Sequence, residues 1–377
     1  MLVLSDWWII ITPEQGITKY LRSILIRLLQ FSTCTKDNSH CRWSQYMSKY
    51  NLLERCFKDP PSILKYIFIK GIKDALIGFL YVAKKQVDEQ LLVKFVIEEL
   101  QKKAKLAPDL KETKEVNSAR GNLALENEFF LVSEYLNPWT VDVDYDESVL
   151  IWHLATDICY WTSQEHGSTD NVDGMDYRSF SKWLSDYMSY LLLRQQSLVS
   201  LVVGMSENRF EDTCAEARKF MNKSLNVHWF SYICAETKKC LCSKLNCQTS
   251  GVECENHGTK EEEEFFKEFC IKVLKVKAHI PPIVAKGDKS KSVLFDACRL
   301  AEQLKMFGSS QWEITSKVWV ELLCYAANRA SPRSHVAQLR RGGELITLVW
   351  LLMAHLGLGE RFLQNQGFGW TKLIIHK

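Results

Sequence analysis

Apolar residues recur at every third or fourth position along most of this chain, and this spacing constrains its fold most strongly. The segments 293–307 (VLFDACRLAEQLKMF) and 312–327 (WEITSKVWVELLCYAA) each place their large apolar side chains on one side of a helix. Only 8 prolines and 17 glycines interrupt 377 residues, which favours long helices over a turn-rich β architecture. The sequence therefore predicts an all-α protein, a multi-helix array with little or no sheet.

The last third of the chain has the clearest helix boundaries. Ser331 followed by Pro332 is a helix-start signal, with serine as the cap and proline at the first helical position. The apolar run 345–356 ends at Gly357, a natural helix stop. Together with 293–307 and 312–327, this run predicts a C-terminal three-helix bundle.

Other helices are predicted upstream of this bundle. Residues 62–84 and 87–105 each show helical spacing, and a helix is expected to begin at Tyr177. Its apolar face is predicted to contain Phe180, Trp183, Leu184, Tyr187, Met188 and Leu191. The segments 102–121, 163–176 and 279–292 are predicted linkers, because they are polar or rich in proline and charge.

These boundaries predict a division of the chain into five regions. The regions are an amphipathic N-terminal segment (1–35), an N-terminal helical domain (36–162), a middle helical region (177–278) with a cysteine-bearing and acidic insertion (240–264), a C-terminal helical domain (291–358) and a divergent tail (359–377).

Charge and composition exclude several classes of protein. A net charge of +3, with scattered basic residues, is too small for a nucleic-acid interface, which needs a concentrated basic patch. The first 12 residues lack the basic leader and cleavage site of a secretory signal. Thirteen cysteines cannot all pair internally, and several lie in apolar helical patterns, so we expect reduced thiols in a cytosol-facing environment. No run reaches the ~20 apolar residues of a spanning helix.

The N-terminal segment leaves two readings open. Residues 20–31 (YLRSILIRLLQF) carry apolar side chains on one side and Arg22 and Arg27 on the other. Such a helix either packs on a protein core or lies on a membrane surface, so residues 2–31 are a candidate for peripheral membrane contact. The 12 tryptophans fit either helix packing or a membrane interface.

Five stretches carry a resemblance to a known family. In chain order they are ESVLIWHLATDICYW, SKWLSDYMSYLLL, KSVLFDACRLAEQL, WVELLCYAANR and QLRRGGELITLVWLLMAHLGL. They resemble a plant family that combines an N-terminal DUF 4220 domain with a C-terminal DUF 594 domain, both of unknown function. The resemblance covers about residues 5–358 and is most specific over 291–358.

The resemblance implies an all-helical, membrane-associated protein, in which several spanning helices usually precede the region seen here. The chain begins near the end of that membrane region, so by itself it is expected to be soluble or peripheral. The family has no established activity, so the resemblance transfers no catalytic residue and no cofactor. Residues 360–377 depart from the family's usual ending.

His153 and Asp157 form the first candidate site. They stand one turn apart on the predicted helix of ESVLIWHLATDICYW, in an almost wholly apolar setting. A carboxylate beside an imidazole suits general-base catalysis of hydrolase type, with Glu321, His335 or His355 as a partner from a second helix. The alternative is a buried pair that satisfies its own polar groups, and this is the interpretation we favour. Asp144 and Glu147 are expected to form a capping box at the start of that helix.

A cysteine-bearing segment is the second candidate site. Cys234 precedes Cys240, Cys242, Cys247, Cys254 and His257, in the spacing C-x5-C-x-C-x4-C-x6-C-x2-H. These ligand types suit zinc, but the C-x2-C knuckle of zinc modules is missing, so reduced thiols in a loop are the favoured interpretation.

The remaining candidates have structural explanations. Cys159 and Cys324 lie in apolar runs, where a thiol is hidden and its pKa is raised, so neither is expected to act as a nucleophile. Arg340 and Arg341 are expected to pair with Glu321 or Glu344. Glu261–Glu264 reads as an acidic helix start, with a tail for a basic partner as the alternative.

The sequence thus favours a non-enzymatic, membrane-associated interaction or scaffold protein with unidentified protein partners. It contains no G-x-S-x-G, H-E-x-x-H, P-loop or G-x-G-x-x-G motif, and no cofactor is implied. A hydrolase using His153 and Asp157, or a zinc-stabilised module around Cys240–His257, remains the alternative.

Overall fold

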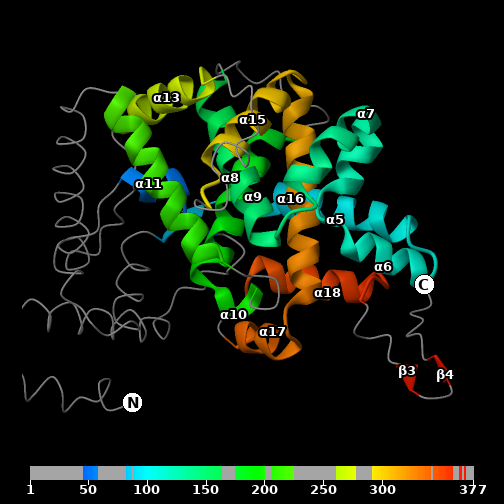
Figure 1. Ribbon diagram of the computed structural model, residues 1–377. Coiled ribbons are helices and arrows are strands. Elements are labelled where there is room, and N and C mark those ends of the chain that lie inside the picture. Colours follow the sequence, from blue (N-terminus) through cyan, green and yellow to red (C-terminus); the bar gives the residue numbers. More distant parts are fainter. Residues whose placement is uncertain are drawn as a thin grey trace, which may run out of the picture. The chain divides into compact units, whose positions relative to one another are not determined.

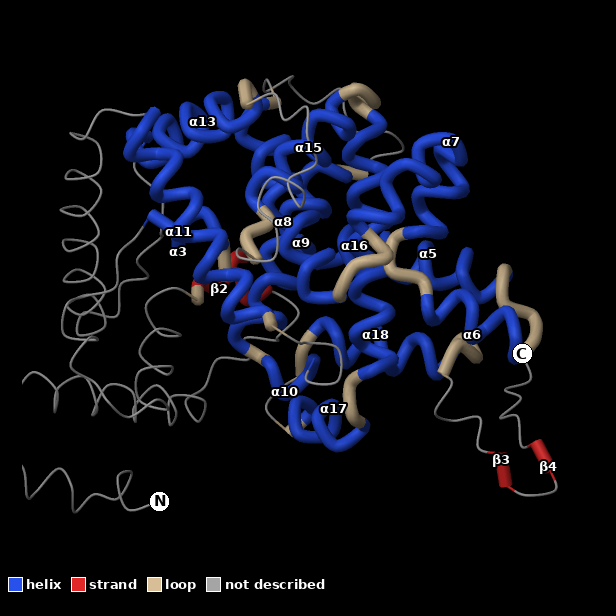
Figure 2. Tube along the Cα trace, viewed as in Figure 1, coloured by secondary structure: helices blue, strands red, loops and turns tan. Residues whose placement is uncertain are grey.

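The architecture is all-α, and helices account for nearly all of the regular structure in Figure 2. The computed structural model describes residues 46–57, 82–86, 89–163, 175–199, 205–224, 260–276, 291–340, 343–359, 365–366 and 369–370. The predicted membrane-contact segment 2–31 and the cysteine-bearing segment 234–257 lie outside these residues. Among the described helices, none is long and apolar enough to cross a bilayer.

The elements follow one another from an N-terminal strand to a C-terminal hairpin (Figure 1). The first half contains β1 (Tyr46–Lys49), α3 (Leu52–Phe57), β2 (Ala83–Gln86), α5 (Glu89–Lys105), α6 (Leu110–Ser118), α7 (Asn122–Thr140) and α8 (Tyr145–Thr162). The second half contains α9 (Tyr177–Arg194), α10 (Gln196–Val199), α11 (Ser206–Ser224), α13 (Lys260–Leu274), α15 (Leu294–Lys305), α16 (Ser310–Arg329), α17 (Pro332–Leu339), α18 (Leu345–His355), β3 (Asn365–Gln366) and β4 (Gly369–Trp370).

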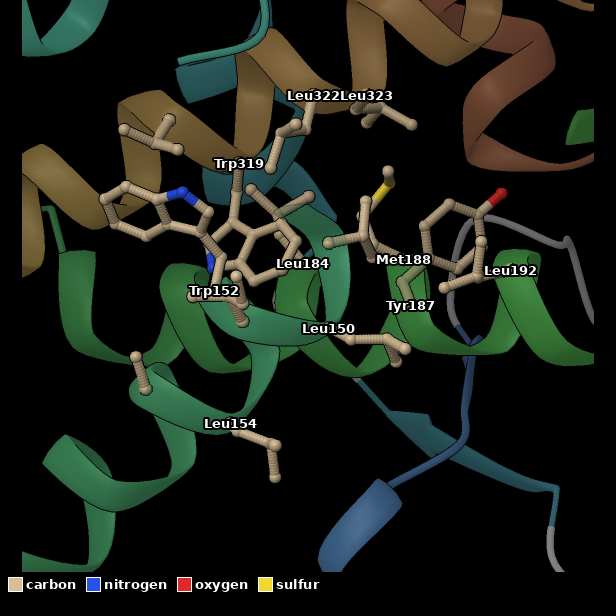
Figure 3. Packing of buried hydrophobic residues seen from close by; sticks show 14 of the residues in the cluster. Leu150, Trp152, Leu154, Leu184, Tyr187, Met188, Leu192, Trp319, Leu322 and Leu323 are labelled. Atoms are coloured by element: carbon tan, nitrogen blue, oxygen red, sulfur yellow. The ribbon is translucent and has the colours of Figure 1, made fainter. Parts of the chain in front are cut away.

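Two helices, α8 and α9, form the centre of the packing. They lie against each other, and α15 covers α8 while α16 covers α9. On the outside, α13 packs on α8 and α15, α18 packs on α16, and α11 packs on α3. One hydrophobic cluster runs through all these helices, and Figure 3 shows Trp152 of α8, Leu184 of α9 and Trp319 of α16 gathered within it.

The sequence of α8 explains its central place. From Val149 to Cys159 every residue is buried, including the polar ones, so the helix has no side that water can reach over this length. A helix that is apolar all round gains most when other helices cover each face, at about 25 cal/mol for each Å² of apolar surface removed from water. Neighbours from α3, α9, α13 and α15 supply that cover.

Several predicted boundaries are confirmed. Helix α9 begins at Tyr177, where the Asp176 carboxylate accepts a hydrogen bond from the Ser179 N–H at 3.0 Å. Helix α17 begins at Pro332, and the Ser331 hydroxyl oxygen caps the Ser334 N–H at 3.1 Å. Gly357 adopts φ +79° directly after α18, which ends that helix.

Other expectations were wrong. Residues 102–121 are no linker, because α5 runs to Lys105 and α6 occupies 110–118. Asp109 starts α6 with a capping box, its carboxylate accepting from the Glu112 N–H at 3.0 Å. The end of the predicted helix 62–84 is wrong, since residues 83–86 form β2, which pairs antiparallel with β1, and residues 62–81 lie outside the described residues.

The C-terminal helices bury one another only in part. Helix α16 packs on α18, as predicted, but α15 lies mainly against α8 and α13. The C-terminal segment therefore completes the same core as the N-terminal helices. The boundaries of the five predicted regions stay a prediction.

The junction between α6 and α7 depends on one glycine. Gly121 adopts φ +119°, and a Cβ there would lie 3.0 Å from Cγ1 of Val318 on α16. Its N–H donates to Oε2 of Glu321 at 2.8 Å, while Oε1 of the same carboxylate accepts from Lys103 of α5, also at 2.8 Å. One buried carboxylate thus joins α5, the start of α7 and α16.

Replacing Gly121 with alanine is expected to lower the free energy of unfolding by about 2–4 kcal/mol, from the strained φ and the contact with Val318. Gly308→Ala is the matched control, because Gly308 has φ +58° and open space around its Cα. It should cost about 1–2 kcal/mol. Urea unfolding measures both, and equal losses in the two variants would contradict the close approach of α16 to Gly121.

Candidate functional site

Six buried polar side chains surround the predicted site, and we call them the His153 cluster. Its members are Asn51, His153, Asp157, Lys182, Ser185 and Asp186. Asn51 stands directly before α3, the next two residues lie on α8, and the last three lie on α9. Each member is less than 9% exposed, and His153, Asp157 and Ser185 are fully buried.

Helical spacing puts these groups face to face. His153 and Asp157 are one turn apart on α8, and Lys182 and Asp186 are one turn apart on α9. Asn51 is fixed because its Oδ1 accepts from the Glu54 N–H at 2.9 Å, the contact of a capping asparagine. The pairing of α8 with α9 and the start of α3 therefore bring all six residues together.

Lys182 supplies the positive charge of the cluster. Its Nζ lies 2.5 Å from Oδ1 of Asp157 and 2.7 Å from Oδ1 of Asp186. Asn51 Nδ2 donates to the same two carboxylates, at 2.6 Å to Asp157 and 3.1 Å to Asp186. Two acids thus share one ammonium and one amide, which offsets the cost of removing them from water.

These contacts set the pKa values of the charged members. Burial alone would raise the pKa of Asp186, but the Lys182 ammonium, with help from Lys49 and His153, lowers it to about 2. Burial alone would lower the pKa of Lys182, yet Asp157 and Asp186 outweigh burial and raise it. Lysine and Asp186 are therefore both ionised across the physiological pH range.

The imidazole of His153 has both nitrogens occupied. The Leu52 N–H donates to Nε2 at 3.1 Å, so Nε2 carries no proton. Nδ1 lies 2.7 Å from Oγ of Ser185, and in this tautomer it donates to that hydroxyl. Burial lowers the pKa of His153 below its usual value, although Asp157 and Asp186 act in the opposite direction. The ring is therefore neutral and fixed in one tautomer.

This arrangement superficially resembles a serine–histidine–aspartate relay but has the wrong polarity. A general base needs an unprotonated nitrogen facing the serine, whereas Nδ1–H of His153 points its proton at Ser185. Oδ2 of Asp157 is 3.9 Å from Nε2, beyond hydrogen-bond distance, and Lys182 neutralises that carboxylate. The hydrolase hypothesis also required a solvent-reachable imidazole, and His153 has no exposed surface.

The suggested second-helix partners lie elsewhere. Glu321 pairs with Lys103. His335 lies between Oγ1 of Thr347 and the carbonyl of Ala327, and His355 is exposed at the end of α18. None of these three contacts His153. The expected pairing of Arg340 with Glu321 or Glu344 is wrong, because Lys103 binds Glu321 and the Tyr187 hydroxyl donates to Glu344. Arg341 lies outside the described residues.

Metal binding is the next possibility for the His153 cluster. One ligand atom from each of His153, Asp157 and Asp186 lies within 4.8 Å of the others, a spacing that suits a cation. However, Lys182 already contacts both carboxylates, and the Leu52 N–H occupies Nε2 of the imidazole. A metal ion would have to displace both, so these residues do not fit one.

The cysteines of the described residues are buried as well. Cys159 and Cys324 lie in the core, and burial raises the pKa of each thiol to about 12. A thiolate nucleophile is therefore disfavoured at both positions. The candidate zinc ligands Cys240, Cys242, Cys247, Cys254 and His257 lie outside the described residues, and zinc binding there stays a prediction.

The expected capping box at the start of α8 is absent. Arg209, which the sequence did not point to, binds the acidic residues there. Asp144 makes no side-chain cap. Instead, Nη2 of Arg209 on α11 lies 2.6 Å from Asp144 and 2.7 Å from Glu147, and Nη1 lies 3.5 Å from Asp146. Burial raises the pKa of Asp146 although Arg209 opposes the shift. This contact ties α11 to the start of α8.

Four members of the His153 cluster, Asn51, Lys182, Ser185 and Asp186, were not predicted from the sequence. A signal existed in the sequence SKWLSDYMSY, where a lysine and an aspartate stand four residues apart on one helix, a spacing that allows them to pair. Their burial depends on the pairing of α8 with α9, and the residue spacing within one helix cannot predict that pairing.

Lys182→Met is expected to lower the free energy of unfolding by about 3–5 kcal/mol, because it leaves Asp157 and Asp186 buried without their cation. Lys111→Met is the control, since that side chain is 85% exposed and should change stability by less than about 0.5 kcal/mol. Adding Asp157→Asn and Asp186→Asn to Lys182→Met should recover part of the loss. Urea unfolding of the four proteins checks this, and a Lys182→Met protein as stable as Lys111→Met would contradict it.

The lowered pKa of His153 predicts a pH dependence. Below the ordinary histidine pKa of about 6.5 the unfolded chain binds a proton that native His153 does not, so the free energy of unfolding falls as pH drops from there toward the native pKa. His153→Gln should remove that part of the slope, whereas His355→Gln, at an exposed position, should retain it. Urea unfolding at a series of pH values tests this, and an unchanged slope in His153→Gln would show that this residue titrates normally.

One segment of the chain matches a known protein family. A family model described as a protein of unknown function, DUF594, matches residues 305–358, which span α16, α17 and α18. Comparison with curated proteins and comparison with solved structures found no match. The chain is thus similar to that family over its C-terminal segment.

Proposed function

We propose that this chain is a non-enzymatic interaction or scaffold protein that associates with a membrane surface. The non-enzymatic part of this proposal rests on one observation: the His153 cluster is buried and its polar groups bind one another. Every chemically useful group in it is bound to another member or to the main chain, and none of the six is exposed. Such a cluster holds three helices together and offers nothing to a substrate.

The accessible surface of the described residues supports the same proposal. A hollow of about 540 Å³ lies along α5, lined by Gln90, Val93, Lys94, Ile97, Glu98 and Gln101. Its charged side chains, Lys94 and Glu98, reach solvent and lie 3.9 Å from each other, so neither is held in a buried setting that would tune it for catalysis. The family that matches residues 305–358 is described as one of unknown function, which favours neither an enzyme nor a scaffold.

The membrane part of the proposal rests on two features of the sequence. One is the resemblance to a plant family of membrane-associated proteins, and the other is the amphipathic basic segment 20–31. Protein partners, which a scaffold requires, are to be sought at a membrane surface facing the cytosol.

Two measurements on the purified full chain test the proposal. A fluorophosphonate probe, which labels activated serines, should leave the native protein unlabelled because Ser185 is sealed and receives a proton from His153. In flotation with phospholipid vesicles, a fraction of the protein should rise with the lipid.

The outcomes separate the two parts of the proposal. Labelling of Ser185 in the native protein would replace the scaffold with a hydrolase. A chain that stays in the aqueous fraction with every vesicle composition would remove the membrane association and leave the non-enzymatic part in place.

A further inference from the structure

The exposed face of α17 combines apolar and basic side chains. Arg333, Val336, Leu339 and Arg340 define this α17 face, and all four are exposed. Val336 is 47% exposed and Leu339 is 48% exposed, which is high for large apolar residues. Spacings of three and seven residues put Arg333, Val336 and Arg340 on the same side of the helix, with Leu339 at its edge. The helix therefore presents an amphipathic surface to solvent.

The opposite face of α17 is fixed to the core. His335 stacks on Trp350 of α18 with 4.5 Å between ring centroids, and its ring nitrogens lie 3.2 Å from Oγ1 of Thr347 and 3.1 Å from the carbonyl of Ala327. Oγ of Ser334 donates to the carbonyl of Ser197 at 2.9 Å, which ties α17 to α10. Helix α17 lies beside α10 and α18 in Figure 1. These contacts hold the α17 face outward.

The two arginines of this face have no acidic neighbour within their own helix, unlike several lysines elsewhere. Lysines on α5, α6 and α16 pair with a glutamate three or four residues away, as in Lys94 with Glu98, Lys111 with Glu115 and Lys317 with Glu313. Arg333 and Arg340 make no ion pair within the described part of the chain. The sequence from 331 to 343 contains no aspartate or glutamate, and Glu344, four residues after Arg340, accepts a hydrogen bond from the Tyr187 hydroxyl at 3.2 Å instead. Both guanidinium groups are therefore available to an outside anion.

An anionic lipid surface fits this combination better than a soluble anion does. Guanidinium groups bind phosphate oxygens by paired hydrogen bonds, and each basic residue near an anionic leaflet contributes to binding. Val336 and Leu339 contribute to the free energy of binding only if the partner also removes their apolar surface from water. The headgroup–acyl boundary of a bilayer does this. A free phosphate would satisfy the arginines and leave both apolar side chains exposed.

We propose that the α17 face is a docking surface for anionic phospholipid membranes, with Arg333 and Arg340 on lipid phosphates and Val336 and Leu339 at the acyl boundary. This inference rests on the proposed membrane association and gives it a location and a lipid class. The contact is peripheral. The short helix α17 supplies one part of it, and other segments of the chain supply the rest.

Flotation of the full chain tests this, with vesicles of phosphatidylcholine alone and vesicles that also contain phosphatidylserine. The wild-type protein should float with the anionic vesicles and progressively less as salt is added. The double variant R333Q/R340Q should weaken that partition by about 30-fold, and V336S/L339S should weaken it as well. K111Q/K114Q, which removes two exposed lysines of α6, is the matched control and should float like the wild type. Because all six positions are exposed, circular dichroism should show folded protein for every variant.

Four results would overturn the α17 docking surface. If R333Q/R340Q floats as well as the wild type, or if the wild type floats equally with neutral vesicles, the α17 face is not the anionic contact, while the membrane association stands. If sedimentation shows a wild-type dimer that R333Q/R340Q converts to monomer, the face binds a second copy. If no vesicle binds the wild type, the membrane association and the α17 contact fail together.

Discussion

The sharing of one lysine between two buried carboxylates is the interaction on which the rest of the structure depends. Asp157 of α8 and Asp186 of α9 would each be costly in the core alone, and Lys182 compensates both at 2.5 and 2.7 Å. Because these groups stand on different helices, their attraction requires α8 and α9 to pair in one register. Asn51 then fixes the start of α3 on the same pair.

At the edges of the core, the buried cations Lys103 and Arg209 also join helices through carboxylates. Lys103 binds Glu321 and so joins α5 to α16, and Arg209 binds Asp144 and Glu147 and so joins α11 to α8. Each contact joins segments that are far apart in the sequence. Apolar packing brings the helices together without strong directional preference, whereas a buried charge accepts few alternative positions. These pairs therefore favour one arrangement of the helices over others.

The helices themselves could be predicted because their signals are local. Apolar spacing located α9, α15, α16 and α18, and the Ser331–Pro332 pair located the start of α17. The errors have physical reasons. Helix α6 is short and polar, so its apolar spacing is weak, and Asp144 has the sequence of a cap but binds an arginine that follows 65 residues later. The partners of His153 depend on which faces of α8 and α9 meet, a long-range property. The exposure of the α17 face likewise becomes visible only when the covered side of the helix is known.

The tautomer and titration of the His153 ring, measured by nitrogen NMR on the full chain, test the sealed character of the cluster most directly. We predict a neutral ring with the proton on Nδ1, which becomes protonated only at a pH below the ordinary histidine pKa, because burial lowers the pKa of His153. An imidazole that titrates near its ordinary pKa, or that carries its proton on Nε2, would show that water reaches the cluster. In that case these residues would again be candidates for catalysis.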